Sequence, residues 1–245
     1  MDPTAILETG TAALLFAATF LVGGRVHPLR ALIRDRRSII SFGGGMSIAY
    51  VFVHLMPELH GVRRAFAASA STSLRYEGMA IYFVALVGFL VFYGLEHLRA
   101  QLREFARGKQ ATLVFRLHVG GFAAYVWLAA YLLVHNLDET EASTALYALA
   151  IAIHFLGVDH ALREEHGAAY EGIGRFLLAG MSVLGWGAGL LVAMPRDVLA
   201  LLAAFISGAI IMNSTIMELP SEKDGRFLPF MSGGVLYGLI LLPLG

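Results

Sequence analysis

The fold is decided by residues 131–166, which read YLLVHNLDETEASTALYALAIAIHFLGVDHALREEH. This stretch holds four of the nine histidines of the chain, together with several carboxylates, between long apolar runs. An ionisable side chain inside a membrane span is costly unless it pairs, binds a ligand or lines a water-filled path. We therefore interpret this hairpin as the candidate functional site, and the rest of the chain as the scaffold that holds it.

The composition indicates an integral membrane protein. The chain has 245 residues, of which 58% are hydrophobic and 15% are charged, and its mean hydropathy is +0.70. Soluble domains carry about 25% charged residues. At roughly 20 residues per bilayer crossing, the length accommodates about eight helices and no separate soluble domain. We therefore expect a single transmembrane domain over residues 1–245.

Cysteine and charge narrow the chemistry. The chain has no cysteine, so disulfides and thiolate metal sites are excluded, and a metal ion would need His, carboxylate, amide or backbone oxygen ligands. Basic and acidic residues balance at 18 each, which argues against a nucleic-acid partner. The partner that this composition predicts is the lipid bilayer.

Long apolar runs predict the membrane spans. A continuous apolar run of this length is typical of a helix, because a sheet edge exposed to lipid cannot satisfy its backbone polar groups. The fold class we predict is therefore all-α, a polytopic membrane protein with eight transmembrane helices. The predicted spans are residues 4–24, 38–57, 78–96, 114–135, 143–161, 174–194, 197–217 and 228–244.

The distribution of Lys and Arg predicts the orientation. The odd-numbered connections, together with Arg116 and Arg175 at the span ends next to them, carry 14 of these residues, and the even-numbered connections carry 4. Because basic residues concentrate on the cytoplasmic side, the odd connections are expected inside and both termini outside. We expect a multi-pass protein of the cell membrane, either a bacterial inner membrane or a plasma membrane.

A short motif suggests an inverted repeat. The pattern Phe-x2-Gly-x11-Pro begins at Phe42 in the second span and recurs at Phe205 in the seventh. These two spans are expected to run in opposite directions, so the copies would be inverted, with helices 1–3 related to helices 6–8. Such repeats are common in transporters that bind substrate near the middle of the membrane.

The outer end of the hairpin offers the first set of candidate metal ligands. His135 and Asn136 close the fourth span, and Glu139 follows His135 by four residues. In a continued helix this spacing puts His135 and Glu139 on one face. Imidazole with carboxylate and amide oxygens suits zinc, iron or manganese. The alternative is a wet outer loop with solvated carboxylates.

The fifth span offers the second set. His154 lies in its middle, and Asp159 and His160 follow in the same helix, which favours ligation or a proton relay. The alternatives are an interior hydrogen bond for His154 and i,i+4 pairs on the helix surface. Asp159 would then pair with Arg163, and His160 with Glu164.

Three further residues are candidates for a transport pathway. His54 and Glu58 lie at the outer end of the second span, on either side of Pro57. They are interpreted as ligands on the way in, and the alternative is an interfacial histidine beside a proline that ends the helix. Glu218 lies near the cytoplasmic end of the seventh span, on the same face as Ser214.

With these residues in place, the chain resembles the ZIP (Zrt/Irt-like) divalent-metal transporters. His135-Asn136-x-x-Glu139 is similar to the His-Asn-x-x-acid motif of the family's fourth helix. Departures are Thr140 for a glycine of the fourth-helix motif, Phe155 for the Glu or Asn after the fifth-helix histidine, and Gly157 for a proline. The other similar stretches are SFGGGMSIAYVFVHLMPEL (41–59), GFLVFYGLEHL (88–98), LAIAIHFLGVDHAL (149–162) and ISGAIIMNSTIMELP (206–220), which look like the second, third, fifth and seventh helices.

The resemblance implies a transporter rather than an enzyme. A divalent cation would pass His54 and Glu58, bind on the fourth and fifth helices, and leave among acidic residues inside. Zinc is the expected substrate, with iron or manganese as alternatives. The resemblance implies a homodimer and no organic cofactor. The implied metal ligands are His135, Asn136, Glu139, His154, Asp159 and His160.

Two other functions remain open from the sequence. The first is an intramembrane zinc-dependent hydrolase, in which three fixed ligands would hold an activated water. The second is a ZIP-like membrane protein that no longer transports, whose polar residues only hold helices together. Convergence of the predicted ligands on one point would favour the hydrolase, and a succession of polar residues across the membrane would favour transport.

Overall fold

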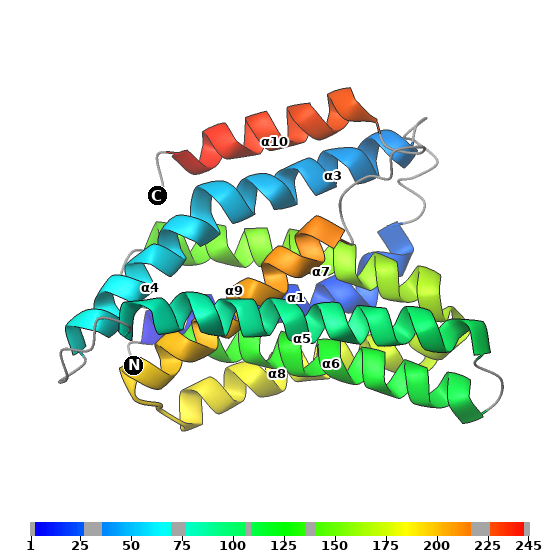
Figure 1. Ribbon diagram of the computed structural model, residues 1–245, viewed down its shortest axis with the longest axis horizontal. Coiled ribbons are helices and arrows are strands. Elements are labelled where there is room, and N and C mark those ends of the chain that lie inside the picture. Colours follow the sequence, from blue (N-terminus) through cyan, green and yellow to red (C-terminus); the bar gives the residue numbers. More distant parts are fainter. Residues whose placement is uncertain are drawn as a thin grey trace. The chain divides into compact units, whose positions relative to one another are not determined.

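The computed structural model describes residues 3–26, 36–69, 77–105, 109–135, 141–216 and 226–242 (Figure 1). Within these ranges the chain is helical apart from short connections and has no strand, which confirms the prediction of an all-α protein. The helices are α1 (Pro3–Val22), α3 (Arg36–Tyr50), α4 (Met56–Ser69), α5 (Glu77–Phe105), α6 (Lys109–Val134), α7 (Glu141–His166), α8 (Arg175–Leu191), α9 (Arg196–Ile216) and α10 (Phe227–Leu241). Short segments η1 (Gly23–Val26), η2 (Val51–Leu55) and η3 (Tyr170–Gly174) complete them.

Helix length and composition agree with a multi-pass membrane protein. Among the described residues, five helical stretches are long and apolar enough to cross a membrane, and they correspond to the first, third, fourth, sixth and seventh predicted spans. The remaining predicted spans fall on the continuous helix α3–η2–α4, on α7 and on α10. The five stretches are Pro3–Val22, Met79–Leu102, Thr112–Val134, Tyr170–Leu191 and Arg196–Thr215.

The chain forms two compact units. Unit 1 comprises Met1–Gly24 and Leu90–Ala193, and unit 2 comprises Arg25–Phe89 and Met194–Gly245. Helix α5 belongs to both, because its sequence changes unit between Phe89 and Leu90. The single transmembrane domain over 1–245 stays a prediction.

Unit 1 is built around α1, which contacts α6, α7 and α8, while α6 contacts both α7 and α8. Phe155 of α7 is fully buried, and its ring lies 5.2 Å from that of Phe16 and 5.3 Å from that of Phe20 on α1. Aromatic pairs of this kind contribute about 0.5–1.5 kcal/mol beyond their buried area. Packing against α1 therefore explains why an aromatic residue follows His154.

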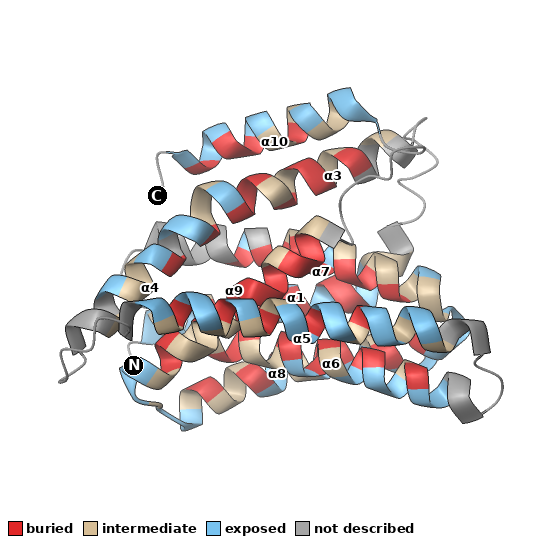
Figure 2. Ribbon diagram, in the orientation of Figure 1, coloured by how far each residue is buried: buried red, intermediate tan, exposed pale blue. Residues whose placement is uncertain are grey.

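In unit 2, α3 and α10 lie side by side, and glycines set their separation (Figure 1). A Cβ added at Gly45 would collide with the carbonyl oxygen of Phe230, and one added at Gly233 would collide with that of Phe42. This reciprocal contact means that the two helices are antiparallel. Figure 2 shows the buried residues of α10 on the side of α3 and its exposed residues on the other side.

The same contact recurs between α5 and α9. A Cβ at Gly208 would collide with the carbonyl oxygen of Ala85, and one at Gly88 with that of Phe205. Small residues let helix backbones approach closely in membranes. The Phe-x2-Gly part of the sequence motif therefore performs the same packing task in α3 and in α9. The inverted relationship of the two copies stays a prediction.

Pro57 does not end its helix, so this part of the alternative interpretation of His54 is wrong, while the interfacial position of His54 stays a prediction. The helix continues to Ser69, and the turn before Pro57 widens into the π segment η2. There the N–H of Met56 donates to the carbonyl of Val51, five residues earlier. Proline cannot donate an N–H and collides with the preceding turn, and a π turn accommodates such a misfit without stopping the helix.

Candidate functional site

His135 lies at one end of unit 1, beside the C-terminal end of α8. Its Nε2 is 3.3 Å from the carbonyl oxygen of Val192, and the hydroxyl of Tyr131 donates to the same oxygen at 2.9 Å. A carbonyl only accepts, so Nε2 of His135 carries a hydrogen. Metal-binding histidines commonly donate one ring N–H to a carbonyl in this way and bind the metal through the other ring nitrogen.

His154 lies in the interior of unit 1. Only 3% of its surface is exposed, and its ring centroid is 5.9 Å from that of Tyr125 on α6. The neighbouring positions Ile151, Phe155 and Val158 are buried too. These residues form one buried face of α7, whose opposite face includes the exposed Leu149 and Leu156. The ring of His154 is thus a polar group on a largely apolar buried face.

Asp159 is a buried carboxylate held by three helical elements. It is 2% exposed, and its Oδ1 accepts the Tyr170 hydroxyl at 2.7 Å and lies 2.9 Å from a guanidinium nitrogen of Arg163. Arg163 also contacts Glu171. A side chain at Gly23, just after α1, would collide with Asp159. The i,i+4 pair expected as the alternative interpretation of Asp159 is thus present.

The predicted ligands follow one another along unit 1 and do not converge. His135 bonds to Val192 after α8, whereas Asp159 bonds to Tyr170 before it. Val192 and Tyr170, on either side of α8, are 22 residues apart in the chain, which at 1.5 Å per residue is roughly 30 Å. His154 lies between His135 and Asp159 in α7.

The remaining candidates are less fully defined. His160 lies 3.3 Å from Glu164, as their spacing predicted. His54 lies in η2 with its ring 5.3 Å from that of Tyr50. For Glu58 only the position in α4 is described. The other three candidates, Asn136, Glu139 and Glu218, lie outside the described residues.

A second polar group at the Asp159 end of unit 1 was not predicted from the sequence. His118 of α6 is 2% exposed; its Nε2 lies 2.7 Å from Glu96 of α5, and its Nδ1 lies 2.8 Å from Nε2 of His166 of α7. Arg99 contacts Glu96 at 2.8 Å and Glu165 at 2.8 Å. We call these five residues the Glu96 cluster. The signal available in the sequence was Glu96 at the end of one apolar run and His118 inside the next.

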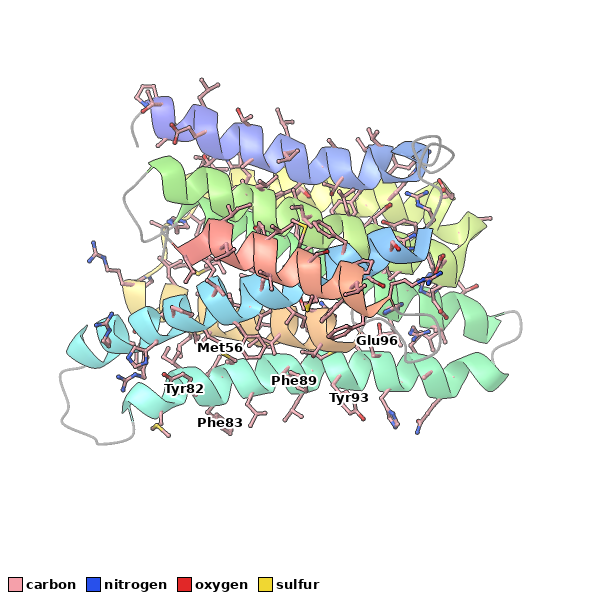
Figure 3. The ribbon with its side chains drawn as sticks, turned by 90° about the horizontal axis from the view of Figure 1, so that it is seen from above. Met56, Tyr82, Phe83, Phe89, Tyr93 and Glu96 are labelled. Carbon is pink, nitrogen blue, oxygen red and sulfur yellow. The ribbon has the colours of Figure 1, made fainter. Side chains whose placement is uncertain are left out.

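Unit 2 contains an apolar pocket of about 440 Å³. Met56, Leu86 and Phe89 contribute to its wall, and in the same wall His60 Nδ1 lies 3.0 Å from the Tyr82 hydroxyl. Figure 3 shows Met56 and Tyr82 close together. The lining is predominantly apolar, and none of the described residues that line it is a carboxylate.

Figure 3 also shows that Phe83 and Glu96 leave α5 on opposite sides of the helix. Phe83 is 66% exposed, whereas Glu96 is buried. This arrangement is expected of a helix in a membrane, where apolar side chains face the lipid and charged side chains face the interior of the protein.

Comparison of the chain with protein-family models, with curated proteins and with solved structures finds no match. Within the described part of the chain, no three His, Asp or Glu side chains are grouped as a metal site would require. The ligand sets predicted from the sequence include residues outside that part.

Proposed function

We propose that this chain transports divalent cations across the membrane, with zinc as the expected ion and iron or manganese as alternatives. The observation that carries the proposal is the position of His154. It is 3% exposed in the middle of α7, with His135 toward one end of the unit and Asp159 toward the other. Ionisable residues at such depth mark ion pathways in membrane proteins.

The spacing of these groups favours a route over a closed catalytic site. A zinc hydrolase needs three ligands around one metal ion. Here the described candidates are distributed along α7, with contacts to opposite ends of α8. A cation that moves from one partial ligand set to the next, completing its coordination with water, suits this distribution.

Asp159 gives the route a barrier at its inner end. Its carboxylate is neutralised by Arg163, which also contacts Glu171. A cation would reach Asp159 only when Arg163 turns toward Glu171, because both positive charges cannot share the buried carboxylate at close range. Arg163 therefore keeps the carboxylate from remaining an unpaired buried charge between transport events.

The packing of unit 2 supports the same class of protein. The matched glycine contacts of α3 with α10 and of α5 with α9 are what an inverted repeat of helices 1–3 and 6–8 requires. Inverted repeats in transporters allow one part to rock against another around a fixed substrate site.

Uptake of radioactive zinc into proteoliposomes tests the proposal. His154→Ala is expected to abolish saturable uptake, since it removes the ring at the middle of the route. His97→Ala is the matched control, because His97 is exposed on α5 and contacts only Gln101 and Tyr93 among the interactions described. Equal uptake by both variants and the unmodified protein would refute the role of His154. Absence of uptake of zinc, iron and manganese by the unmodified protein would refute transport.

A further inference from the structure

The Glu96 cluster is not part of the proposed metal route. Glu96 and Arg99 come from α5, His118 from α6, and Glu165 and His166 from α7. Contacts of 2.7 and 2.8 Å link a carboxylate and two imidazoles in one chain, Glu96 to His118 to His166. A continuous chain of ionisable groups of this kind can carry a proton as well as bind one.

The positions of the hydrogens in this chain follow from the partners. A carboxylate only accepts, so Nε2 of His118 carries a hydrogen that it donates to Glu96. Between Nδ1 of His118 and Nε2 of His166, which are 2.8 Å apart, one hydrogen is shared. Either His166 donates it to a neutral His118, or His118 is an imidazolium and donates it to His166.

Charge decides between these two arrangements. With both imidazoles neutral, the carboxylates of Glu96 and Glu165 exceed the one guanidinium of Arg99, and the cluster carries one net negative charge. One added proton makes the cluster neutral. Because a net charge is costly away from water, a buried group of this composition favours taking up that proton.

We propose that the Glu96 cluster is a binding site for one proton, which is held on His118 and taken up through His166. A proton bonds to Nδ1 of His166 while the hydrogen on its Nε2 moves to Nδ1 of His118. His118 then becomes an imidazolium beside Glu96, and His166 is again neutral with its hydrogen on Nδ1. The reverse steps release the proton.

Burial explains why uptake occurs at His166. His118 is 2% exposed and its ring lies 5.3 Å from that of Phe122, whereas His166 is partly exposed beside Phe115. Burial and the neighbouring His118 lower the pKa of His166 to about 4. His166 therefore passes a proton inward and does not retain it.

Magnetic resonance of the full chain with isotope-labelled histidine, in lipid nanodiscs, tests this site directly. The His118 and His166 signals are assigned with His118→Gln and His166→Gln. At about pH 6, within the range where histidine titrates, His118 is expected to carry hydrogen on both ring nitrogens and His166 on one. A His118 ring with an unprotonated nitrogen at this pH would overturn the proposal, whatever the variants do.

Glu96→Gln provides the second arm, with His97→Gln as its control. Replacing the carboxylate by an amide is expected to leave His118 with an unprotonated ring nitrogen at about pH 6, because the negative charge that favours the added proton is gone. His97, the next residue, is exposed, so its variant is expected to keep hydrogen on both ring nitrogens of His118. A His118 ring that carries hydrogen on both nitrogens in a folded Glu96→Gln protein would also overturn the proposal. Because no metal is added, the result does not depend on cation transport.

Discussion

At the scale of single residues, Asp159 is the group of unit 1 that most needs its partners. A carboxylate that is 2% exposed is stable only while Arg163 and Tyr170 satisfy it. Breaking a buried ion pair from one side leaves an uncompensated charge, and removing both charges is far less harmful. The pair therefore determines how unit 1 tolerates substitution.

We expect Arg163→Gln to destabilise the protein by about 3–5 kcal/mol. The double variant Asp159→Asn, Arg163→Gln is expected to recover most of this loss, because no buried charge remains. Thermal unfolding in detergent, followed by circular dichroism, measures both effects. Arg196→Gln, at an exposed position of α9, serves as the control. If the double variant were as unstable as Arg163→Gln, the unpaired charge of Asp159 would not be the cause of the instability.

His166 predicts a pH dependence of stability. Its pKa is lowered from 6.5 to about 4 by burial and by His118, so the unfolded chain binds a proton here more readily than the folded one. The stability that His166 contributes is fully present above about pH 6.5 and is lost as the pH falls from there toward about 4. Unfolding of His166→Gln over this range is expected to depend less on pH. An identical pH dependence in both proteins would contradict this.

The sequence identified His154 and Asp159 on one helix and anticipated the Asp159–Arg163 pair, because both depend on local helical spacing. It did not identify the Glu96 cluster. His118 is 22 residues from Glu96 and 48 from His166, so their contacts depend on how α5, α6 and α7 are rotated about their axes. Hydropathy alone does not determine those rotations.

At the scale of helices, glycine controls how closely α3 and α10 approach. At Gly45 a Cβ would collide with backbone atoms of α10, which cannot move independently of their helix. At Gly43, two residues earlier on the same helix, no described atom lies within 4 Å of the added Cβ. The two positions therefore form a natural pair for separating helix packing from helix propensity.

Gly45→Ala is expected to destabilise the protein by about 1–3 kcal/mol, the usual cost of overpacking. Gly43→Ala is expected to be neutral or stabilising by up to about 1 kcal/mol, because alanine favours the helix more than glycine does. The unfolding temperatures of the two variants and the unmodified protein are measured in the same detergent and compared. Equal effects at the two positions would show that close contact with α10 does not limit Gly45.

The helix boundaries show what the sequence could predict about elements. Apolar runs located the helices, because lipid demands both their length and their composition. The passage of a helix through Pro57 was not predicted, since a proline usually marks an end or a kink. Whether a π turn absorbs the misfit depends on the tertiary contacts of η2 and α4, among them those with α9.

At the scale of the whole molecule, the Lys and Arg counts predict the orientation in the membrane, with 14 in the odd connections and the span ends next to them and 4 in the even connections. The two ends of the η3–α8 stretch provide a compact test. Ala168 is exposed just before η3, and Ala193 is exposed between α8 and α9. Between them, Tyr170–Leu191 is long and apolar enough to cross the bilayer once.

We expect Ala193→Cys to react with a membrane-impermeant maleimide in intact cells, and Ala168→Cys to react only after the membrane is permeabilised. The unmodified chain contains no cysteine, so every labelled product reports the introduced residue, and the unmodified protein is the control for background. Labelling of Ala168→Cys alone in intact cells would show that the orientation is the reverse of the predicted one, with the Asp159 end of unit 1 outside.

Labelling of both variants in intact cells would show that this helix does not cross the membrane. A route from His135 to Asp159 across the membrane would then have no physical basis. The outcome therefore decides the direction in which a cation would meet these residues, independently of any transport measurement.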